Sequence, residues 1–190
     1  LSDKIGKEKT IWRYDPIILT DKIGIDYHCK HFDMISSKLE GYTDRCIISF
    51  VDSYKKTERN MGSIKIIPID NQKMLELGER LSEIGHKYGI NIGTCSEMIN
   101  LSSAGIEHAR CIDDRLISKI IGRKIAVKKD KNQRTSCGCA ESVDIGAYNT
   151  CRHGCLYCYA NYSDVKVRNN ISTHSLNSAM LTGDIEPDDK

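Results

Sequence analysis

The sequence predicts an α/β protein with parallel strands, arranged as a partial (β/α) barrel and followed by a C-terminal cysteine-rich cluster loop. Short apolar runs alternate along the chain with segments of helical periodicity, which is the pattern of repeated βα units. One run, Arg45 to Asp52, is continuously apolar at its centre, as in a strand that is buried on both faces. The strands are too few to close an eight-stranded barrel, so we expect either that a further N-terminal part supplies the other strands or that the sheet is open.

The first half of the chain holds a strand, a helix and the buried strand. Thr10 to Asp15 is a short β-prone run that meets Pro16. Ile25 to Leu39 places its apolar residues on one helical face, and Gly41 is the expected stop. Ser53 to Ser63 is polar and is expected to be a loop.

The second half continues the alternation. In order, we expect a helix capped by Asp70 and ending at Tyr88, a strand over Ile90–Cys95, a short helix over Asp113–Ile121, a strand over Asp144–Tyr148 and a helix from Tyr159. The expected organisation is a single domain with three regions: βα repeats over 1–136, a cysteine-rich iron–sulfur loop region over 137–165, and a tail over 166–190.

Composition limits the class of protein. The 190 residues are 39% hydrophobic and 28% charged, an ordinary mixture for a soluble domain. A net charge of +2 gives no basic excess for nucleic acid, and no apolar run is long enough to span a bilayer. With no signal peptide and an odd count of nine cysteines, a cytoplasmic protein with ligating thiols is expected rather than a disulfide framework. Because Leu1 is not a Met and Ser2 to Glu8 reads as the end of a helix, the chain is expected to be the C-terminal part of a longer protein.

Three closely spaced cysteines carry the main functional signal. Cys151, Cys155 and Cys158 stand in C-x3-C-x2-C spacing, so one short loop can present three thiolates to one inorganic cluster. Since a four-iron cluster normally takes four thiolates, three would leave one iron open to a small molecule. The alternatives are a zinc site, in which His153 is a further candidate ligand, or reduced thiols without a metal.

A second constellation consists of Cys95, Cys111, Cys137 and Cys139. If the fold brings them together, these thiols can form an all-cysteine site for zinc or for a second cluster. Cys137 and Cys139 are separated only by Gly138, which permits a sharp turn. Cys29 and Cys46 lie in a predicted helix and strand and are expected to be structural.

Two carboxylates follow predicted strands. Asp15 and Asp52 stand where two parallel strands end, which is where ligands bind in α/β folds, so both are candidate catalytic residues. The alternative is that each aspartate caps the turn that follows it.

Asn149, just before the cysteine loop, is a candidate to hydrogen-bond cluster sulfurs or a cofactor carboxylate.

The cysteine loop, with Tyr157 directly before its last cysteine, resembles the signature loop of radical-SAM enzymes. More widely, six segments occur in order: Trp12–Ile17, Cys46–Asp52, Gly93–Glu97, Cys111–Arg115, Cys137–Cys139 and Asp144–Asn161. Together they resemble a prokaryotic family defined as a domain of unknown function, number eighteen forty-eight, whose C-terminal cysteines are likened to the radical-SAM loop. The resemblance covers nearly the whole chain.

The resemblance implies a [4Fe–4S] cluster on the three loop cysteines, with S-adenosylmethionine bound at the open iron and Tyr157 beside its adenine. Because the loop stands near the C-terminus, it also implies a circularly permuted barrel. No glycine-glycine-glutamate run is present to hold the methionine amine. The implied partners are an unidentified substrate and an electron donor such as a ferredoxin or flavodoxin. The other functions considered are a non-enzymatic electron-transfer module and a zinc-stabilised binding protein.

Overall fold

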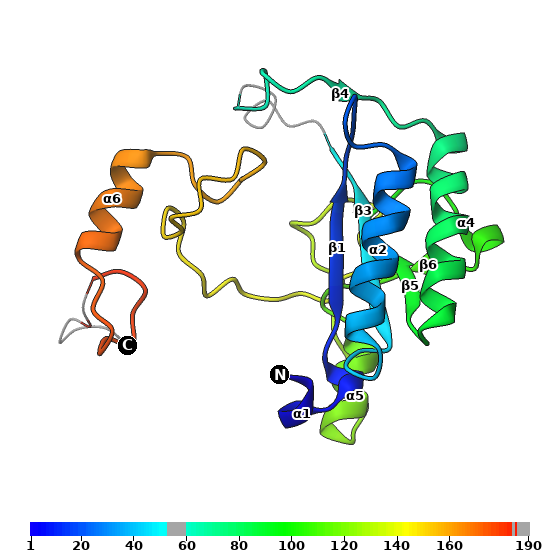
Figure 1. Cartoon of the computed structure of the whole chain (residues 1–190). Coiled ribbons are helices and arrows are strands. Elements are labelled where there is room, and N and C mark those ends of the chain that lie inside the picture. The colour runs from blue at the N-terminus through cyan, green and yellow to red at the C-terminus, as the bar shows by residue number, and fades with distance from the viewer. Residues whose placement is uncertain (53–59, 184, 186–190) are drawn as a thin grey trace. The chain divides into compact units, whose positions relative to one another are not determined.

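The computed structural model describes residues 1–52, 60–183 and 185 (Figure 1). These residues form two compact units. The larger unit comprises Leu1–Asp52 and Lys65–Ser142, and the smaller unit comprises Ser53–Ile64 and Val143–Lys190. Most of the predicted loop Ser53–Ser63 lies outside the described residues.

An open parallel sheet forms the centre of the larger unit. Its strand order is β1 (Trp12–Ile17), β3 (Arg45–Phe50), β5 (Asn91–Thr94) and β6 (Glu107–His108), and each neighbouring pair is parallel. The predicted α/β class with parallel strands is therefore confirmed, whereas the described part of the chain does not close into a barrel. β1 continues past Pro16 to Ile17 through an irregularity in its register with β3.

Two amphipathic helices connect the first three strands and pack against each other. Along the chain, α2 (Ile25–Leu39) follows β1 and precedes β3, and α4 (Asn71–Lys87) follows β3 and precedes β5 (Figure 1). Phe32 of α2 and Leu77 of α4 are fully buried in the same core as Ile48 of β3. Removing these apolar side chains from water is the main driving force for docking the helices on the sheet.

The helix boundaries follow their capping residues. Asp70 accepts a hydrogen bond at 2.8 Å from the backbone nitrogen of Lys73, and Asp113 caps α5 (Asp114–Ile121) in the same way. Gly122 ends α5 in the left-handed conformation, at φ 71°. The predictions for α2, α4 and α5 are thus confirmed. α1 (Ser2–Ile5) and the 3₁₀ helices η1 (Lys7–Lys9) and η2 (Ser102–Ala104) are short.

Some sequence predictions differ from the structure. The predicted strand over Asp144–Tyr148 is wrong: this segment has no strand, because Ile145 is 95% exposed and has no sheet to cover. The predicted helix from Tyr159 instead begins later, as α6 (Asp164–Ser172). A small antiparallel pair, β2 (Leu19–Thr20) with β4 (Ile66–Ile67), was not predicted. No helix among the described residues has the length and apolar character needed to cross a membrane.

Phe32→Ala should lower the free energy of unfolding by about 3–5 kcal/mol, because it leaves a cavity under the sheet. Phe32 is fully buried, and its ring stacks on that of Trp12 with centroids 4.6 Å apart. Urea denaturation followed by circular dichroism measures the change. Met34→Ala, on the exposed side of the same helix, is the matched control and should cost within about 0.5 kcal/mol. Equal losses in the two variants would contradict the core assignment.

Candidate functional site

Two thiols meet at the edge of the sheet where the strands end. Cys95 directly follows β5, and Cys111 follows the end of β6 by three residues. Because β5 and β6 are adjacent and parallel, both chains leave the sheet at the same edge. The two sulfur atoms are 3.1 Å apart.

Arg13 and Asp15 of β1 border this pair. Nη1 of Arg13 donates a hydrogen bond to the sulfur of Cys111 at 2.8 Å, and its Nε donates to Oδ1 of Asp15 at 3.3 Å. The hydroxyl of Ser49 on β3 lies 3.4 Å from Oδ2 of the same carboxylate. Asp15, predicted as a catalytic residue, therefore orients an arginine toward a cysteine.

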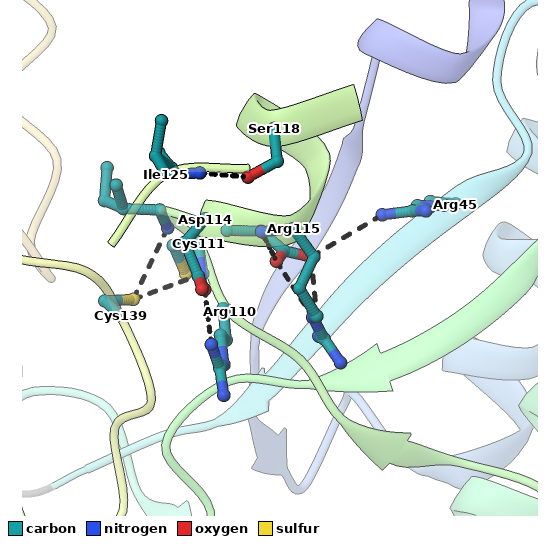
Figure 2. Close-up of polar contacts among 10 residues, drawn as sticks. Arg45, Arg110, Cys111, Asp114, Arg115, Ser118, Ile125 and Cys139 are labelled. Atoms are coloured by element: carbon teal, nitrogen blue, oxygen red, sulfur yellow. Dashed lines mark hydrogen bonds and ion pairs between the residues drawn. The ribbon is translucent and has the colours of Figure 1, made fainter. Parts of the chain in front are cut away.

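The other two thiols of the constellation lie beside Cys111. The sulfur of Cys139 accepts hydrogen bonds from the backbone nitrogens of Cys111, at 3.2 Å, and Ile112, at 3.5 Å (Figure 2). Cys137 and Cys139 are both buried, and their thiols are hydrogen-bonded to each other. The structure thus brings Cys95 and Cys111 together with the Cys137–Cys139 turn, which follows Cys111 by 26 residues in the sequence.

Gly138 lets this turn lie close to an arginine. A Cβ at position 138 would come within 3.2 Å of the side chain of Arg110, which is itself ion-paired with Asp114 of α5 (Figure 2). Close thiols do not by themselves make a preformed metal centre. Among the described residues, no three His, Cys, Asp or Glu side chains form a group that could hold a metal ion.

The pKa values of Cys95 and Cys111 are shifted in opposite directions. Hydrogen bonding with Cys111 lowers the pKa of Cys95 to about 7. Hydrogen bonding with Arg13 also lowers it, whereas burial raises it. The same contact with Cys95 raises the pKa of Cys111. Burial raises the pKa of Cys137. Cys95 is therefore the member of the pair that ionises first.

Asp52, the second predicted catalytic carboxylate, lies in a different cavity of the larger unit. It forms an ion pair with Arg134, and both line a cavity of about 370 Å³ together with Glu97. Oε1 of Glu97 accepts a hydrogen bond at 2.9 Å from the backbone nitrogen of Phe50. Burial, reinforced by the nearby Asp52, raises the pKa of Glu97. Sequence reasoning did not propose Glu97, although its place just after β5 was an available signal.

The three loop cysteines line one cavity of about 720 Å³ in the smaller unit. Cys151 and Cys155 are exposed, and Cys158 is half-buried. α6 provides another wall of this cavity, with Asp164 and Arg168 among the lining residues. A cavity of this size is in the range of small-molecule sites.

Asn149 and Asn161 hold the cysteine loop in place. The buried Oδ1 of Asn149 accepts hydrogen bonds from the backbone nitrogens of Tyr162, at 2.9 Å, and Ser163, at 3.1 Å. Nδ2 of Asn161 donates to the carbonyl of Cys151 at 2.5 Å, and its backbone nitrogen lies 3.4 Å from the sulfur of Cys158. Asn149, predicted as a cofactor residue, thus directs its oxygen to the backbone. Tyr157 is half-buried within the loop.

A protein-family model covers most of the chain. The model of a family described as Domain of unknown function (DUF1848) matches residues 1–160, which include the sheet, the four clustered thiols and the cysteine loop. Neither the curated proteins nor the solved structures gave a match.

The alkylation rate of Cys95 by iodoacetamide should rise with pH around a midpoint near 7 and level off at higher pH, since the thiolate is the nucleophile. More of this thiol is therefore ionised at pH 7 than of an ordinary cysteine, of which a few per cent is thiolate. Mass spectrometry of the Cys95 peptide measures the rate. Cys111→Ala removes the hydrogen bond and should move the midpoint upward, whereas Cys29→Ala, in α2, should not. A wild-type midpoint near 9 would contradict this assignment.

Proposed function

The chain belongs to the family described as Domain of unknown function (DUF1848), and from its own residues we propose that it is an iron–sulfur protein acting as a radical-SAM-like enzyme. The proposed ligands of a [4Fe–4S] cluster are Cys151, Cys155 and Cys158. The observation that carries the proposal is that all three line the same cavity of about 720 Å³. Three thiolates leave one iron of the cluster for a small molecule.

The loop suits such a cluster in chemistry and in accessibility. Thiolates are the ligands that iron–sulfur clusters take, and two of the three cysteines are exposed to an incoming cluster. Gly154, at φ 63°, allows a tight turn between Cys151 and Cys155. When bound together with S-adenosylmethionine, the cluster would supply the electron for reductive cleavage of the sulfonium.

The described part of the smaller unit buries few side chains. Within its described part, only Met61 and Asn149 are buried. A unit this small normally needs a metal, a disulfide or a partner in place of an apolar core. Its three cysteines are free thiols. Cluster ligation would therefore supply folding energy to this unit as well as chemistry.

Two charged residues of α6 suit the amino-acid end of S-adenosylmethionine. Asp164 and Arg168 are four residues apart on the helix, hence on one face, and both line the cysteine cavity. The carboxylate would hold the ammonium group and the guanidinium the carboxylate of the ligand. These residues would stand in for the glycine-glycine-glutamate run that the chain lacks. Tyr157 would flank the adenine, and Asn149 would position the loop.

The architecture of the larger unit is compatible with a partial or permuted barrel. The strands β1, β3, β5 and β6 stand side by side in the order in which they occur along the chain, and α2 and α4 pack into one core. Consecutive βα units of a barrel have the same arrangement. Asp15, two residues before the end of β1, and Asp52, two residues after the end of β3, remain our candidates for substrate contacts. The proposed electron donor is a ferredoxin or flavodoxin, and the proposed location is the cytoplasm.

An electron-transfer module is the second candidate, because the exposed Cys151 and Cys155 leave the loop open to a redox partner.

Anaerobically reconstituted protein should bind about four irons with matching acid-labile sulfide at the loop. Cys151→Ala, Cys155→Ala and Cys158→Ala should each remove that cluster, as measured by iron analysis and electron paramagnetic resonance. Cys29→Ala and Cys46→Ala, at buried positions of α2 and β3, are the matched controls and should retain it. Tightly bound zinc without sulfide, in protein expressed with ample iron, would favour the zinc-stabilised binding protein instead.

S-adenosylmethionine should perturb the paramagnetic spectrum of the reduced cluster and bind in equilibrium dialysis. Arg168→Ala should weaken that binding about tenfold, because one charge-assisted contact is lost, while iron content stays unchanged. Tyr157→Ala should likewise reduce ligand binding more than iron binding. Lys166→Ala, on the same helix but beside Tyr162, is the control. An unchanged spectrum with a fully loaded cluster would favour the electron-transfer module.

A further inference from the structure

The contact between Cys95 and Cys111 joins two partly exposed thiols. Their sulfurs are 3.1 Å apart, and a disulfide requires about 2.05 Å, so closure needs the sulfurs to approach by about 1 Å. Both side chains are partly exposed, so a small reagent can reach them. Cys29 and Cys46, by contrast, are buried in regular elements of the core.

The surroundings of the pair favour thiolate chemistry. The guanidinium of Arg13, held by Asp15, contacts the sulfur of Cys111 at 2.8 Å. A fixed cation beside a thiol stabilises its thiolate. The thiolate is the form that attacks, and also the form that is released, in thiol–disulfide exchange. The neighbouring Cys139 is buried, and its sulfur already accepts two backbone N–H groups. Cys95 and Cys111 are thus the accessible pair of the four.

We propose that Cys95 and Cys111 are a redox-active dithiol that is oxidised to an intramolecular disulfide by exchange with a small disulfide of the glutathione type. The thiolate of Cys95 attacks one sulfur of the reagent, which breaks its S–S bond and releases one thiolate. Cys111, having lost its proton to solvent, then attacks the Cys95 sulfur and releases the second thiolate. The two cysteines are oxidised, the small disulfide is reduced to two thiols, and the two cysteine protons end on those thiols.

This activity goes beyond the proposed function and uses cysteines other than the proposed cluster ligands, with Asp15 the one residue that both proposals name. All of its groups lie in the larger unit, on β1 and on the segments that follow β5 and β6. It requires no cluster at the cysteine loop. In a reducing compartment such a pair is expected to cycle between its two forms rather than remain oxidised.

The test is disulfide mapping on the full chain. Reduced protein is incubated anaerobically with oxidised glutathione and a chelator, quenched with acid, alkylated with N-ethylmaleimide and digested with trypsin. Cleavage after Arg110 places Cys95 and Cys111 on separate peptides, so their bond links two peptides. The expected product is that linked pair, with two fewer alkylated thiols. In Cys111→Ser, Cys95 should retain one glutathione, because the second attack cannot occur. In Cys29→Ser, the matched control, the link should form as in wild type.

Two further measurements separate disulfide formation from effects on folding and on cluster binding. Circular dichroism melting tests whether each serine variant is folded. The mapping is repeated in the full chain with Cys151, Cys155 and Cys158 all changed to Ala, where the Cys95–Cys111 link should persist. The proposal is overturned if both thiols are alkylated in folded, glutathione-treated protein, or if the link joins Cys137 or Cys139 instead. It is equally overturned if the four thiols hold a stoichiometric metal ion that survives the chelator and blocks alkylation.

Discussion

The parallel pairing of β3 with both of its neighbours is the constraint on which the larger unit depends. Ile48, in the middle of β3, is fully buried and lies opposite Tyr14 of β1 and Thr94 of β5. A one-residue slip would turn the side chains of β3 to the opposite face and expose those that pack under α2 and α4. The apolar packing of the two helices therefore sets the register, and the register sets where each strand ends.

The same hydrogen-bond ladder continues past the strands and positions the thiols. The backbone nitrogen of Cys95 donates to the carbonyl of Ile48 at 2.9 Å, and that of Ala109 donates to the carbonyl of Thr94 at 2.8 Å. Cys111 follows Ala109 by only two residues, so its position is set almost as firmly as that of Cys95. Gly93 belongs to this arrangement, because a Cβ there would come within 2.8 Å of the Cβ of Ala109. The thiol contact is thus a consequence of sheet packing.

The sequence was informative where burial produces a pattern. The helices over Ile25–Leu39 and Asn71–Lys87 and the buried strand β3 were predictable because their apolar side chains repeat with the period of the element. β6 has two residues, both exposed, and so carries no pattern of its own. Asp144–Tyr148 has apolar residues that suggest a strand, but a strand needs a neighbour, and local sequence does not show whether one exists. Whether Cys95 and Cys111 meet the Cys137–Cys139 turn depends on the order of the strands, which local sequence does not show.

The two units hold their cysteines by different physical means. In the larger unit, a buried core fixes the backbone, and the thiols take the positions that the sheet assigns to them. In the described part of the smaller unit, hydrogen bonds made by side chains such as Asn149, Asn161 and Asn170 hold the loop, and apolar burial contributes little. A loop held mainly by hydrogen bonds can move its sulfur atoms toward a ligand at a small cost in free energy. Thiols whose backbone is fixed by a sheet react mainly with groups that already lie beside them. This difference is why we assign cluster capture to the loop and thiol exchange to the sheet edge.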